Sequence, residues 1–387
     1  MKIMPFLKSV RIQNFKAISD SKNVALTPLT AFIGNNGSGK SSLIEGLDTY
    51  RTIVADGLDY AMSRWLGFEH AWNKPVHIKN QLYLDNNLDK YPMAFSWSAN
   101  VSGNVLQSSL KVETKPKFNG QFIQEESAKK RSGWSLQRSA TGHYSIEHTD
   151  LPVQLGTLDS DKSALPRDAK EFVSGWQFLT LAPERMGVPA LKRMAVSGTQ
   201  MLQRDGSNLA QYLLAIRDKD IAAYDGIVDA MRFVLDYAKE FQPIETQEVQ
   251  RTMYLSMKEK NRTIPSWMLS TGTLRVLALL AALRNPDPPK VLIIEEIENG
   301  LDPRTIHLIL EEIRVAVQSG RTQVILTTHS PYFLNLLPLQ TIVLVERDAG
   351  GSPLFWRPAD ESEVKEWGRK FAPGELYTTG RFKRVRS

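Results

Sequence analysis

The sequence predicts an α/β fold with an antiparallel β subdomain and a helical subdomain inserted into it. A glycine-rich loop at residues 34–39 separates a strand-like segment from a helix-like one. Strand-like and helix-like segments alternate again after Leu269, and short strand-like pieces fill much of the stretch between. Alternation of this kind is typical of a parallel sheet covered by helices, whereas closely spaced short strands indicate an antiparallel sheet.

The N-terminal segment predicts two strands followed by a helix. The stretches SVRIQNFKAI and NVALTPLTAFIG alternate apolar and polar residues, which is typical of strands, and the second ends at Gly34. The stretch KSSLIEGLDTYRTIVADGL that follows is typical of a helix. The glycine-rich loop therefore lies between a strand and a helix, which is the context that a phosphate-binding loop requires.

The middle and C-terminal parts of the chain change character twice. Residues 76–155 contain short strand-like pieces separated by Asn, Gly, Pro and Ser: HIKNQLYLD, PMAFSWSANV, SSLKVETK, GQFIQEE, GWSLQRS and HYSIEHT. Residues 190–242 have a helical period and predict helices, and strands follow in IETQEVQRTMYLSMKEKN. From Leu269 the predicted order is helix, strand, helix, strand, strand: TGTLRVLALLAALRN, KVLIIEE, RTIHLILEEIRVAVQSG, TQVILTTHS and TIVLVER.

These patterns predict four segments. Residues 1–75 form an N-terminal lobe with the glycine-rich loop, and residues 265–387 form a C-terminal lobe that completes the same α/β core. Residues 76–170 form the inserted antiparallel β subdomain, and residues 171–264 form a helical lid subdomain.

Composition excludes some kinds of site and partner for this chain. The 387 residues include no cysteine, which excludes disulfides and thiolate zinc sites and favours a cytoplasmic location. No apolar run approaches the roughly 20 residues that span a bilayer, so we expect no membrane partner. The net charge of +6 permits contact with nucleic acid through basic clusters at residues 129–131, 258–262 and 381–386, although each cluster is also typical of a solvated loop or tail.

The loop GNNGSGKS at residues 34–41 matches the pattern of a phosphate-binding loop. Glycines let successive backbone N–H groups converge on phosphate oxygens, and the following helix directs its N-terminus at the same anion. Lys40 would reach the β- and γ-phosphates, and the Ser41 hydroxyl would bind Mg²⁺. The alternative is a tight turn with capping serines. The predicted nucleotide contacts of this loop are Asn35, Asn36, Gly37, Ser38, Gly39, Lys40, Ser41 and Ser42.

The stretch VLIIEE places two carboxylates after a buried strand. The run from Val291 to Ile294 is apolar throughout, which is typical of a central parallel strand. Glu295 and Glu296 follow at the edge where α/β folds bind ligands. Because neighbouring strand residues point to opposite sides, one carboxylate can hold Mg²⁺ while the other polarises an attacking water. A solvated acidic loop is the alternative.

Two further segments combine capping residues with possible anion contacts. Ser270 to Gly272 begin an apolar helix, so Ser270 is either a simple helix cap or part of a second anion site. His329 follows a strand that we expect to neighbour the acidic one. A lone histidine there is ordinarily structural, but this one could hydrogen-bond a γ-phosphate or position the water.

In this order, the segments resemble the motifs of ABC-class ATPases, in particular the soluble branch of SMC, RecF and OLD-like proteins. That branch includes AAA family ATPases of bacterial antiphage defence systems. The loop resembles Walker A, residues 269–272 resemble the LSxG signature, and VLIIEE resembles Walker B with Glu296 as its catalytic residue. GLDP resembles the D-loop with Asp302, and His329 resembles the switch histidine. The stretches APERMG, DGSNLAQYL and GELYTTGRF also resemble this branch.

The resemblance has two departures. Walker B usually ends in aspartate before the catalytic glutamate, and this chain has Glu295, whose extra methylene moves the metal-binding carboxylate outward. The glutamine of the Q-loop has only one candidate, Gln177.

The resemblance implies an ATPase that uses ATP and Mg²⁺ and works as a homodimer. Two copies would close head to tail around ATP, with Ser270, Gly272 and Asp302 of one copy completing the nucleotide site built on the other copy's Lys40. Glu296 and His329 would act in hydrolysis, and loss of the γ-phosphate would loosen the dimer.

For function, the resemblance implies a sensor or clamp that acts on DNA or on a separate effector, a nuclease or toxin, in antiphage defence. The chain has no cysteine metal site and no cluster of histidines typical of a nuclease, so we expect the effector to be another protein. The alternative is a clamp for DNA repair or chromosome maintenance like recombination protein F. The energising domain of a membrane transporter is disfavoured by the large insertion.

Overall fold

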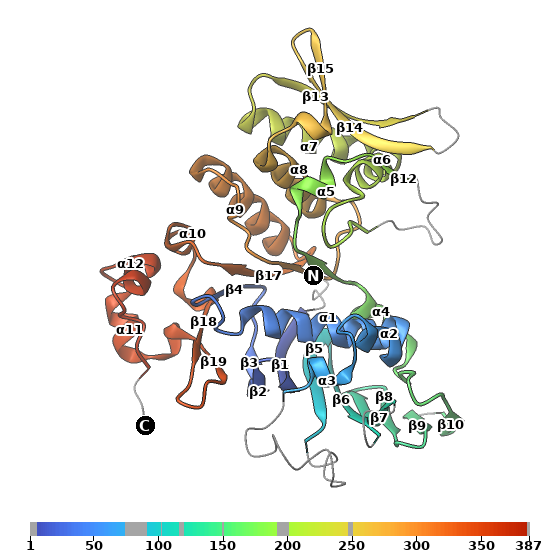
Figure 1. Ribbon diagram of the computed structural model, residues 1–387. Helices are drawn as coiled ribbons and strands as arrows, with labels where there is room; N and C mark the ends of the chain where they lie inside the picture. Colours follow the sequence, from blue (N-terminus) through green and yellow to red (C-terminus); the bar gives the residue numbers. More distant parts are fainter. Residues whose placement is uncertain are drawn as a thin grey trace. The chain divides into compact units, whose positions relative to one another are not determined.

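The computed structural model describes residues 6–73, 91–101, 103–115, 120–148, 151–191, 201–246 and 251–384. The strand expected in HIKNQLYLD and the boundary expected at residue 75 lie outside these residues. The chain divides into two compact units (Figure 1). The first unit contains residues 1–176 and 337–387, and the second contains residues 177–336.

The first unit is built on a nine-stranded antiparallel sheet with the order β10-β9-β8-β7-β6-β5-β1-β2, in which β3 also pairs with β1. The N-terminal strand β1 pairs with β5, so the first strands of the chain and the strands of the predicted β subdomain form one sheet. The strands are β1 (Phe6–Phe15), β2 (Ile18–Asp20), β3 (Val24–Ala25), β5 (Met93–Val101), β6 (Asn104–Thr114), β7 (Gln121–Lys130), β8 (Trp134–Arg138), β9 (His143–His148) and β10 (Gln154–Thr157).

One face of this sheet packs on helix α1 (Lys40–Asp56), which contacts β1 and β5 and runs across them in Figure 1. The approach is close, because a Cβ atom at Gly46 would lie 2.5 Å from the Ile12 side chain. Aromatic rings fill the layer beside α1: Phe15, Tyr50, Phe95, Trp97, Phe172 and Trp176. The other face carries short polar side chains, as in the cross-strand row Ser96, Ser109 and Ser127, which is typical of a sheet with one solvated face.

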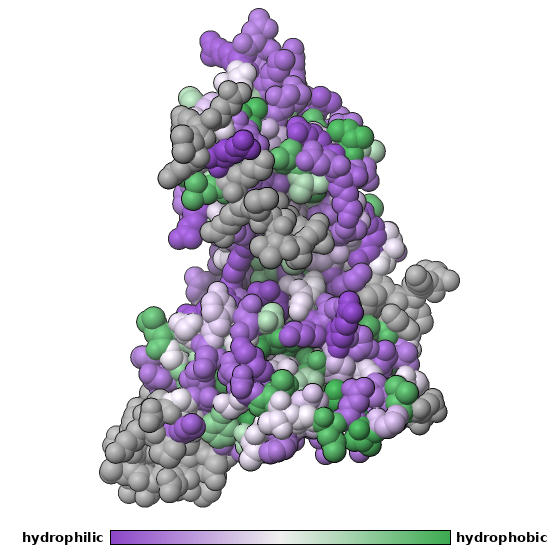
Figure 2. Space-filling view, turned by 90° about the vertical axis from the view of Figure 1, so that its right-hand side faces the viewer, coloured by the Kyte–Doolittle hydropathy of each residue, from purple (hydrophilic) through white to green (hydrophobic). Residues whose placement is uncertain are grey.

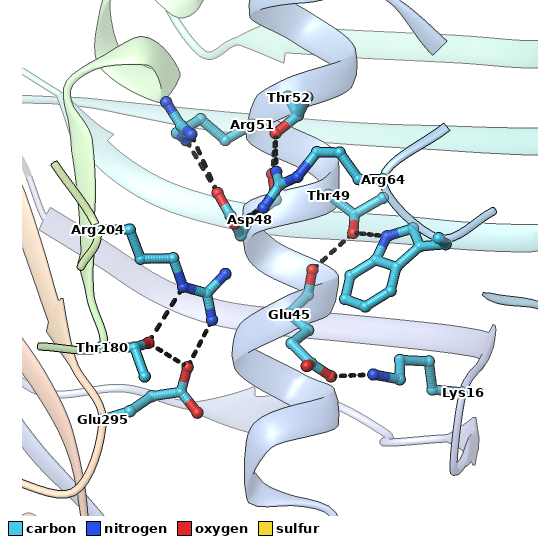
Figure 3. A network of polar contacts seen from close by, with 11 residues as sticks. Lys16, Glu45, Asp48, Thr49, Arg51, Thr52, Arg64, Thr180, Arg204 and Glu295 are labelled. Carbon is cyan, nitrogen blue, oxygen red and sulfur yellow. Dashed lines mark hydrogen bonds and ion pairs between the residues drawn. The ribbon is translucent and has the colours of Figure 1, made fainter. Parts of the chain in front are cut away.

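Polar contacts tie α1 to its surroundings (Figure 3). The buried Asp48 carboxylate accepts a hydrogen bond from Arg64 at 2.7 Å, and Arg64 also donates to the Thr52 hydroxyl at 2.7 Å. Lys16 pairs with Glu45 at 2.5 Å. These contacts fix the orientation of α1, which begins directly after the glycine-rich loop. The neighbouring short helices are α2 (Leu58–Ser63), α3 (Phe68–Ala71) and α4 (Arg167–Ser174).

The first unit also contains strands that lead into and brace the glycine-rich loop. Strand β4 (Leu29–Ile33) is buried along its whole length and ends directly before the loop. It runs parallel to β18 (Ile342–Arg347), which pairs antiparallel with β19 (Pro353–Trp356). The C-terminal part adds α11 (Ser362–Trp367) and α12 (Pro373–Thr378).

The second unit has a buried strand layer with helices packed around it. The strands β11 (Trp176–Leu179), β16 (Val291–Ile294) and β17 (Gln323–Thr328) are neighbours in that order, and β16 runs parallel to β17. Helices α8 (Thr271–Arg284) and α9 (Pro303–Gln318) pack on each other, and α10 (Pro331–Asn335) follows β17. The predicted order from Leu269 onward is observed as α8, β16, α9, β17 and β18, and the short helix α10 between the last two strands was not predicted.

The rest of the second unit combines helices with a small sheet. The helices are α5 (Pro183–Met186), α6 (Leu209–Lys219) and α7 (Ile221–Val234); the sheet contains β12 (Ala190–Leu191), β13 (Ala238–Glu245), β14 (Thr252–Glu259) and β15 (Arg262–Pro265).

Of the residues 190–242 expected to be helical, Leu209–Lys219 and Ile221–Val234 form helices α6 and α7. The prediction is wrong at both ends, where β12 pairs with β14 and β13 also pairs antiparallel with β14. Phe241 and Pro243 of β13 are buried while Gln242 between them is exposed, so burial there follows the period of a strand. Pairing with β14 therefore overrides the helical propensity of this short segment.

The α/β fold class with an antiparallel sheet is confirmed. No helix in the described part of the chain is long and apolar enough to cross a membrane. On the face drawn in Figure 2, hydrophilic residues predominate and hydrophobic residues are interspersed among them.

Candidate active site

The glycine-rich loop is compact because two of its glycines exclude a side chain. A Cβ atom at Gly34 would lie 2.1 Å from the Val345 carbonyl oxygen, and one at Gly39 would lie 2.3 Å from the Pro353 ring. Gly39 also has a φ of 112°, which L-residues rarely adopt. The backbone can therefore turn sharply between β4 and α1 without a side chain in the way.

The N-terminus of α1 and the Lys40 ammonium together fit a phosphate chain. The helix has no side-chain cap and no acidic residue in its first turn, so its partial positive charge is not offset locally. The buried Lys40 ammonium donates to the carbonyl oxygens of Gly34 at 2.7 Å and Asn35 at 3.0 Å, which folds it back over the loop. Ser41 is exposed and Ser42 is buried.

Two residues that sequence analysis missed brace the loop. Arg347 at the end of β18 donates two hydrogen bonds to the Gly37 carbonyl oxygen, at 2.8 Å and 2.5 Å. The Tyr377 hydroxyl on α12 donates to the Asn35 side chain at 3.2 Å, and burial raises the pKa of Tyr377. Both residues lie more than 300 positions away in the sequence, and the only signal for Tyr377 was its place in the stretch GELYTTGRF.

In the second unit, Glu295 directly follows β16 and is buried. Its backbone N–H donates to the Leu179 carbonyl oxygen at 2.9 Å, which continues the pairing with β11. Its carboxylate accepts hydrogen bonds from Arg204 at 2.7 Å and from the Thr180 hydroxyl at 2.9 Å (Figure 3). Neither partner could be found from the motif pattern, because both come from distant segments.

Glu296 is exposed and has a left-handed backbone, with a φ of 49°. Its N–H donates to the Thr327 hydroxyl at 2.9 Å, and its carboxylate accepts a hydrogen bond from the Asn299 side chain. Glu295 is buried and Glu296 is exposed, so the two glutamates have different surroundings. Strand β16 ends at Ile294, so strand alternation does not extend to them, and Glu296 instead has a left-handed backbone. A non-glycine residue in this conformation is uncommon and is found disproportionately at functional sites.

His329 lies directly after β17, beside the segment that contains the two glutamates. Its backbone N–H donates to the Glu298 carboxylate at 2.5 Å, and the Ile297 N–H donates to the Thr327 carbonyl oxygen at 3.2 Å. The His329 residue is half-buried, and the following Ser330 caps α10. The second unit therefore brings together the acidic segment, residues 295–298, and the histidine segment, residues 327–330.

The predicted signature segment caps a helix and remains accessible. The Ser270 hydroxyl accepts a hydrogen bond from the Thr273 N–H at 3.1 Å, which confirms the capping interpretation. Ser270 and Thr271 are exposed. Gly272 packs so closely on the acidic segment that a Cβ atom there would lie 2.6 Å from the Gly300 carbonyl oxygen. An anion-binding role for Ser270 is compatible with this geometry and stays a prediction.

Asp302 caps α9. One of its oxygens accepts hydrogen bonds from the N–H groups of Arg304 at 2.9 Å and Thr305 at 3.1 Å, and the other accepts from the Thr305 hydroxyl at 2.5 Å. The Thr305 hydroxyl, followed by these backbone donors, holds the pKa of Asp302 below its ordinary value.

Gln177, the candidate for the Q-loop, is buried in β11. Its side-chain amide donates to the Leu202 carbonyl oxygen at 2.8 Å. It therefore supports the segment around Leu202, and its role toward a nucleotide stays a prediction.

The donor set suits Mg²⁺ held together with a substrate. No group of three His, Cys, Asp or Glu side chains with metal-binding geometry occurs in the residues that the structure describes. Magnesium is commonly held by one or two protein oxygens together with phosphate oxygens and water. The exposed Ser41 hydroxyl and the Glu295 carboxylate are each an oxygen of this kind, and their joint binding of one Mg²⁺ stays a prediction.

Two domain families match this chain. Residues 4–53, which include the glycine-rich loop, match the family described as "AAA ATPase domain". Residues 174–335, which include the acidic and histidine segments, match the family described as "AAA domain, putative AbiEii toxin, Type IV TA system".

Among individual proteins, the chain is similar to an "ATP/GTP phosphatase" of Helicobacter pylori, with 22% identity over 92% of this chain and 94% of that protein. It is also 42% identical to the "Nod factor export ATP-binding protein I" of Sinorhizobium fredii, but over only 18% of this chain and 20% of that protein. Among solved structures, it resembles an SMC head bound to the C-terminal winged-helix domain of ScpA, with a TM-score of 0.50, 14% identity, and coverage of 91% of this chain and 97% of that one.

The domain matches cover both halves of the motif set, and the likeness to the SMC head concerns the fold. The chain is an ATPase with AAA-type domains, and its fold resembles that of the SMC head.

Proposed function

We propose that this ATPase forms a homodimer in which two copies meet head to tail around ATP. The observation that carries the proposal is the exposed N-terminus of α8, where Ser270 and Thr271 face solvent and the first turn has no acidic residue. Such a helix end attracts an anion. In the dimer, that anion is the γ-phosphate of the ATP bound to the other copy's Lys40.

The glycine-rich loop supplies the main phosphate contacts in this proposal. Lys40 neutralises charge on the β- and γ-phosphates, and the backbone N–H groups at the start of α1 bind phosphate oxygens. Ser41 and Glu295 hold Mg²⁺, which, when bound, withdraws charge from the phosphate oxygens.

The two carboxylates have different tasks. Glu296 is exposed and accepts the proton of the attacking water, and its contact with Asn299 orients the carboxylate. His329 hydrogen-bonds the γ-phosphate or positions the water, while Asp302 contributes to the nucleotide contacts of the dimer. Loss of the γ-phosphate removes the charge that attracts α8 of the other copy, so hydrolysis opens the dimer.

The dimer is tested by measuring mass in solution with light scattering, with and without ATP and Mg²⁺. We expect Glu296→Gln to retain ATP and remain dimeric, and Lys40→Ala to stay monomeric because it does not bind ATP. Ser270→Asp keeps a good helix cap but places a carboxylate where the γ-phosphate would lie, so this variant should bind ATP and stay monomeric. A Ser270→Asp variant that dimerises with ATP as the parent protein does contradicts the proposal.

The preference of the protein for ATP or GTP needs a separate test. The name of the Helicobacter pylori relative includes GTP as well as ATP. We propose ATP as the substrate of this chain, and competition between ATP and GTP in binding and hydrolysis measures the preference.

We further propose that the dimer is a cytoplasmic sensor or clamp that controls a separate effector, a nuclease or toxin, in antiphage defence. The domain family that matches residues 174–335 is described as part of a toxin–antitoxin system, which supports a role together with an effector protein. Isolation of the native complex identifies the partner. A replication or repair protein in place of a nuclease or toxin favours the alternative function, a clamp in DNA repair or chromosome maintenance.

DNA is the second proposed partner, and the turn between β14 and β15 is the candidate contact. Lys258, Lys260 and Arg262 are exposed there. By contrast, Lys130 in the basic cluster at residues 129–131 already pairs with Asp168 at 2.7 Å. A cationic hairpin with exposed side chains is suited to phosphate contacts.

The DNA contact is tested by salt titration. Each phosphate contact adds about 0.9 to the slope of log affinity against log salt concentration, so replacing Lys258, Lys260 and Arg262 with glutamine should lower the slope by about 3. The same replacement at residues 129–131 is the matched control and should change the slope less. Binding that does not depend on salt would remove DNA from the proposed partners.

A further inference from the structure

We propose that Arg204 is a positioning residue for Glu295: together with Thr180, it holds the carboxylate of Glu295 so that one oxygen is presented to Mg²⁺. This inference rests on the proposed role of Glu295 as a metal ligand. It concerns residues that all belong to the second unit, and it gives a role to the segment that contains DGSNLAQYL.

The three side chains form a closed hydrogen-bonded ring (Figure 3). One guanidinium nitrogen of Arg204, Nη2, donates to Glu295 Oε1 at 2.7 Å, and another, Nε, donates to the Thr180 hydroxyl at 3.1 Å. The Thr180 hydroxyl donates in turn to the same Oε1 at 2.9 Å. A hydroxyl has one donor and can also accept, so the Thr180 hydroxyl uses both capacities within the ring.

Both donors converge on Oε1 and leave Oε2 for another partner. In the part of the chain that the structure describes, no hydrogen bond to Oε2 is found, although the side chain is about 10% exposed. A carboxylate oxygen can accept more than one hydrogen bond, and the second oxygen of the same carboxylate can bind a cation. The arrangement therefore fixes the side chain without using the oxygen that a metal requires.

The backbone on both sides of the ring is also fixed. The Thr180 N–H donates to the Arg204 carbonyl oxygen at 2.8 Å, and the Ala182 N–H donates to the Asp205 carbonyl oxygen at 3.0 Å. Gln177 holds the Leu202 carbonyl oxygen at 2.8 Å. The position of Arg204 is thus set by β11 and the residues after it, the same strand that pairs with the Glu295 backbone.

The contacts with Arg204 and Thr180 compensate for the replacement of the usual Walker B aspartate by Glu295. Glutamate has one more methylene than aspartate, so its carboxylate reaches farther and has an additional rotatable bond. The Arg204–Thr180 pair limits that freedom in a buried site, where an ordered charge pair with satisfied hydrogen bonds is more effective than a mobile one.

The test compares ATP affinity in Mg²⁺ with ATP affinity in EDTA, in full-length protein carrying Glu296→Gln to suppress hydrolysis. The ratio of the two dissociation constants is the gain from metal. Loss of a residue that orients a metal ligand commonly lowers metal affinity by about 10-fold to 100-fold. We expect Arg204→Met to lower the gain by about 10-fold or more, and Arg204→Lys to lower it less.

Arg185→Met is the matched control. Arg185 pairs with Asp205, the residue after Arg204, at 3.1 Å and does not contact Glu295 in the described residues. This variant should therefore leave the metal gain unchanged. Thr180→Val removes one donor of the ring and is the second variant if Arg204→Met does not fold, as judged by circular dichroism and thermal unfolding.

A double-mutant cycle adds a readout that a purely structural role would not change. Glu295→Asp withdraws the carboxylate from Arg204, so it should lower the metal gain, and the double variant with Arg204→Met should lower it little further. Independent, additive losses contradict the inference.

The remaining outcomes separate this inference from the proposed function. If Glu295→Gln lowers the metal gain and Arg204→Met does not, Glu295 is a metal ligand but Arg204 does not position it. A rise in metal gain in Arg204→Met also overturns the inference, because Arg204 would then compete with the metal. If Glu295→Gln leaves the gain unchanged, the metal assignment fails and the role of Arg204 fails with it.

Discussion

At the residue scale, the left-handed backbone of Glu296 is the feature most closely tied to chemistry. Glu296 has a φ of 49° and an exposed side chain, and it directly follows the buried Glu295. Two adjacent glutamates therefore have different surroundings: one is buried and paired with Arg204, and the other is accessible to a water molecule.

The first prediction concerns Glu296. A general base contributes about 100-fold to 10,000-fold to a rate, so Glu296→Gln should lower ATP hydrolysis by about that factor while ATP binding is retained. Phosphate release under saturating ATP and direct nucleotide binding measure the two quantities. Glu311→Gln, on the exposed side of α9, is the control and should hydrolyse ATP normally. Normal hydrolysis by Glu296→Gln would falsify the catalytic assignment.

The second prediction concerns the glycines of the phosphate loop. Gly34→Ala would place a Cβ atom 2.1 Å from a backbone oxygen that cannot move independently, so it should lower both the melting temperature and ATP affinity. Gly37→Ala meets nothing within 4 Å, and its φ of 72° costs only about 1–2 kcal/mol. It should therefore have the smaller effect. Equal effects would show that close packing does not shape this loop.

Sequence analysis found the residues that belong to contiguous patterns and missed those that meet them in space. Lys40, Glu296 and His329 follow local strand, loop and helix signals, so their elements could be predicted. Arg204 and Arg347 carry no local signal, since each acts by reaching a segment about 90 or more positions away. Such contacts depend on the tertiary fold and cannot be found from spacing.

At the scale of elements, the ends of helices carry much of the candidate site. Helix α1 begins without a side-chain cap, whereas α8 and α9 begin with the capping residues Ser270 and Asp302. The uncapped helix follows the phosphate loop, where its N–H groups are needed by an anion. The capped helices are stabilised by their own side chains, so their caps are separable from any nucleotide contact.

The third prediction separates the two roles of Asp302. Asp302→Ala should lower the free energy of unfolding by about 1 kcal/mol because α9 loses its cap, while Asp302→Asn keeps a good cap and should stay closer to the parent protein. A normal melting temperature together with lost ATP hydrolysis in Asp302→Asn would indicate a nucleotide role beyond capping.

The pH dependence of Asp302 has a defined sign. Its pKa in the folded protein is lowered, so the ionised carboxylate stabilises the fold above the ordinary pKa of aspartate, and this contribution is lost as pH falls through the lowered pKa. The stability difference between the parent protein and Asp302→Asn should therefore shrink on acidification. Chemical unfolding of both proteins across this acidic range measures it, and a constant difference contradicts the assignment.

The elements also show why part of the fold was not predictable. The segment after Val234 has residues that favour helices, but it becomes β13 because β14 offers it a pairing partner. In the same way, nothing local in β1 indicates that it pairs with β5 rather than with the strands beside the glycine-rich loop. Long-range strand pairing decides both cases.

At the scale of the whole molecule, the motif set is divided between two compact units. The phosphate loop lies in the first unit, and the acidic, signature and histidine segments lie in the second. The sequence predicted four consecutive segments, and that finer division stays a prediction. Residues 337–387 belong to the same compact unit as the N-terminal residues.

The fourth prediction concerns the bracing of the phosphate loop by this C-terminal part. Arg347→Met removes both hydrogen bonds to the Gly37 carbonyl oxygen, so the loop should become less ordered and ATP affinity should fall. Hydrogen exchange of the loop and ATP affinity measure the effect. Arg357→Met, which replaces another arginine of the same C-terminal region, is the control and should leave the loop unchanged.

Mixing two inactive variants tests the head-to-tail dimer most directly. In Lys40→Ala the phosphate loop is defective, and in Ser270→Asp the segment offered to the other copy is defective. A mixed dimer pairs the intact Lys40 of one copy with the intact Ser270 of the other, so the mixture should hydrolyse ATP although neither variant does so alone. If mixed dimers form and remain as inactive as the separate variants, each copy completes its own ATP site and the proposed dimer is wrong.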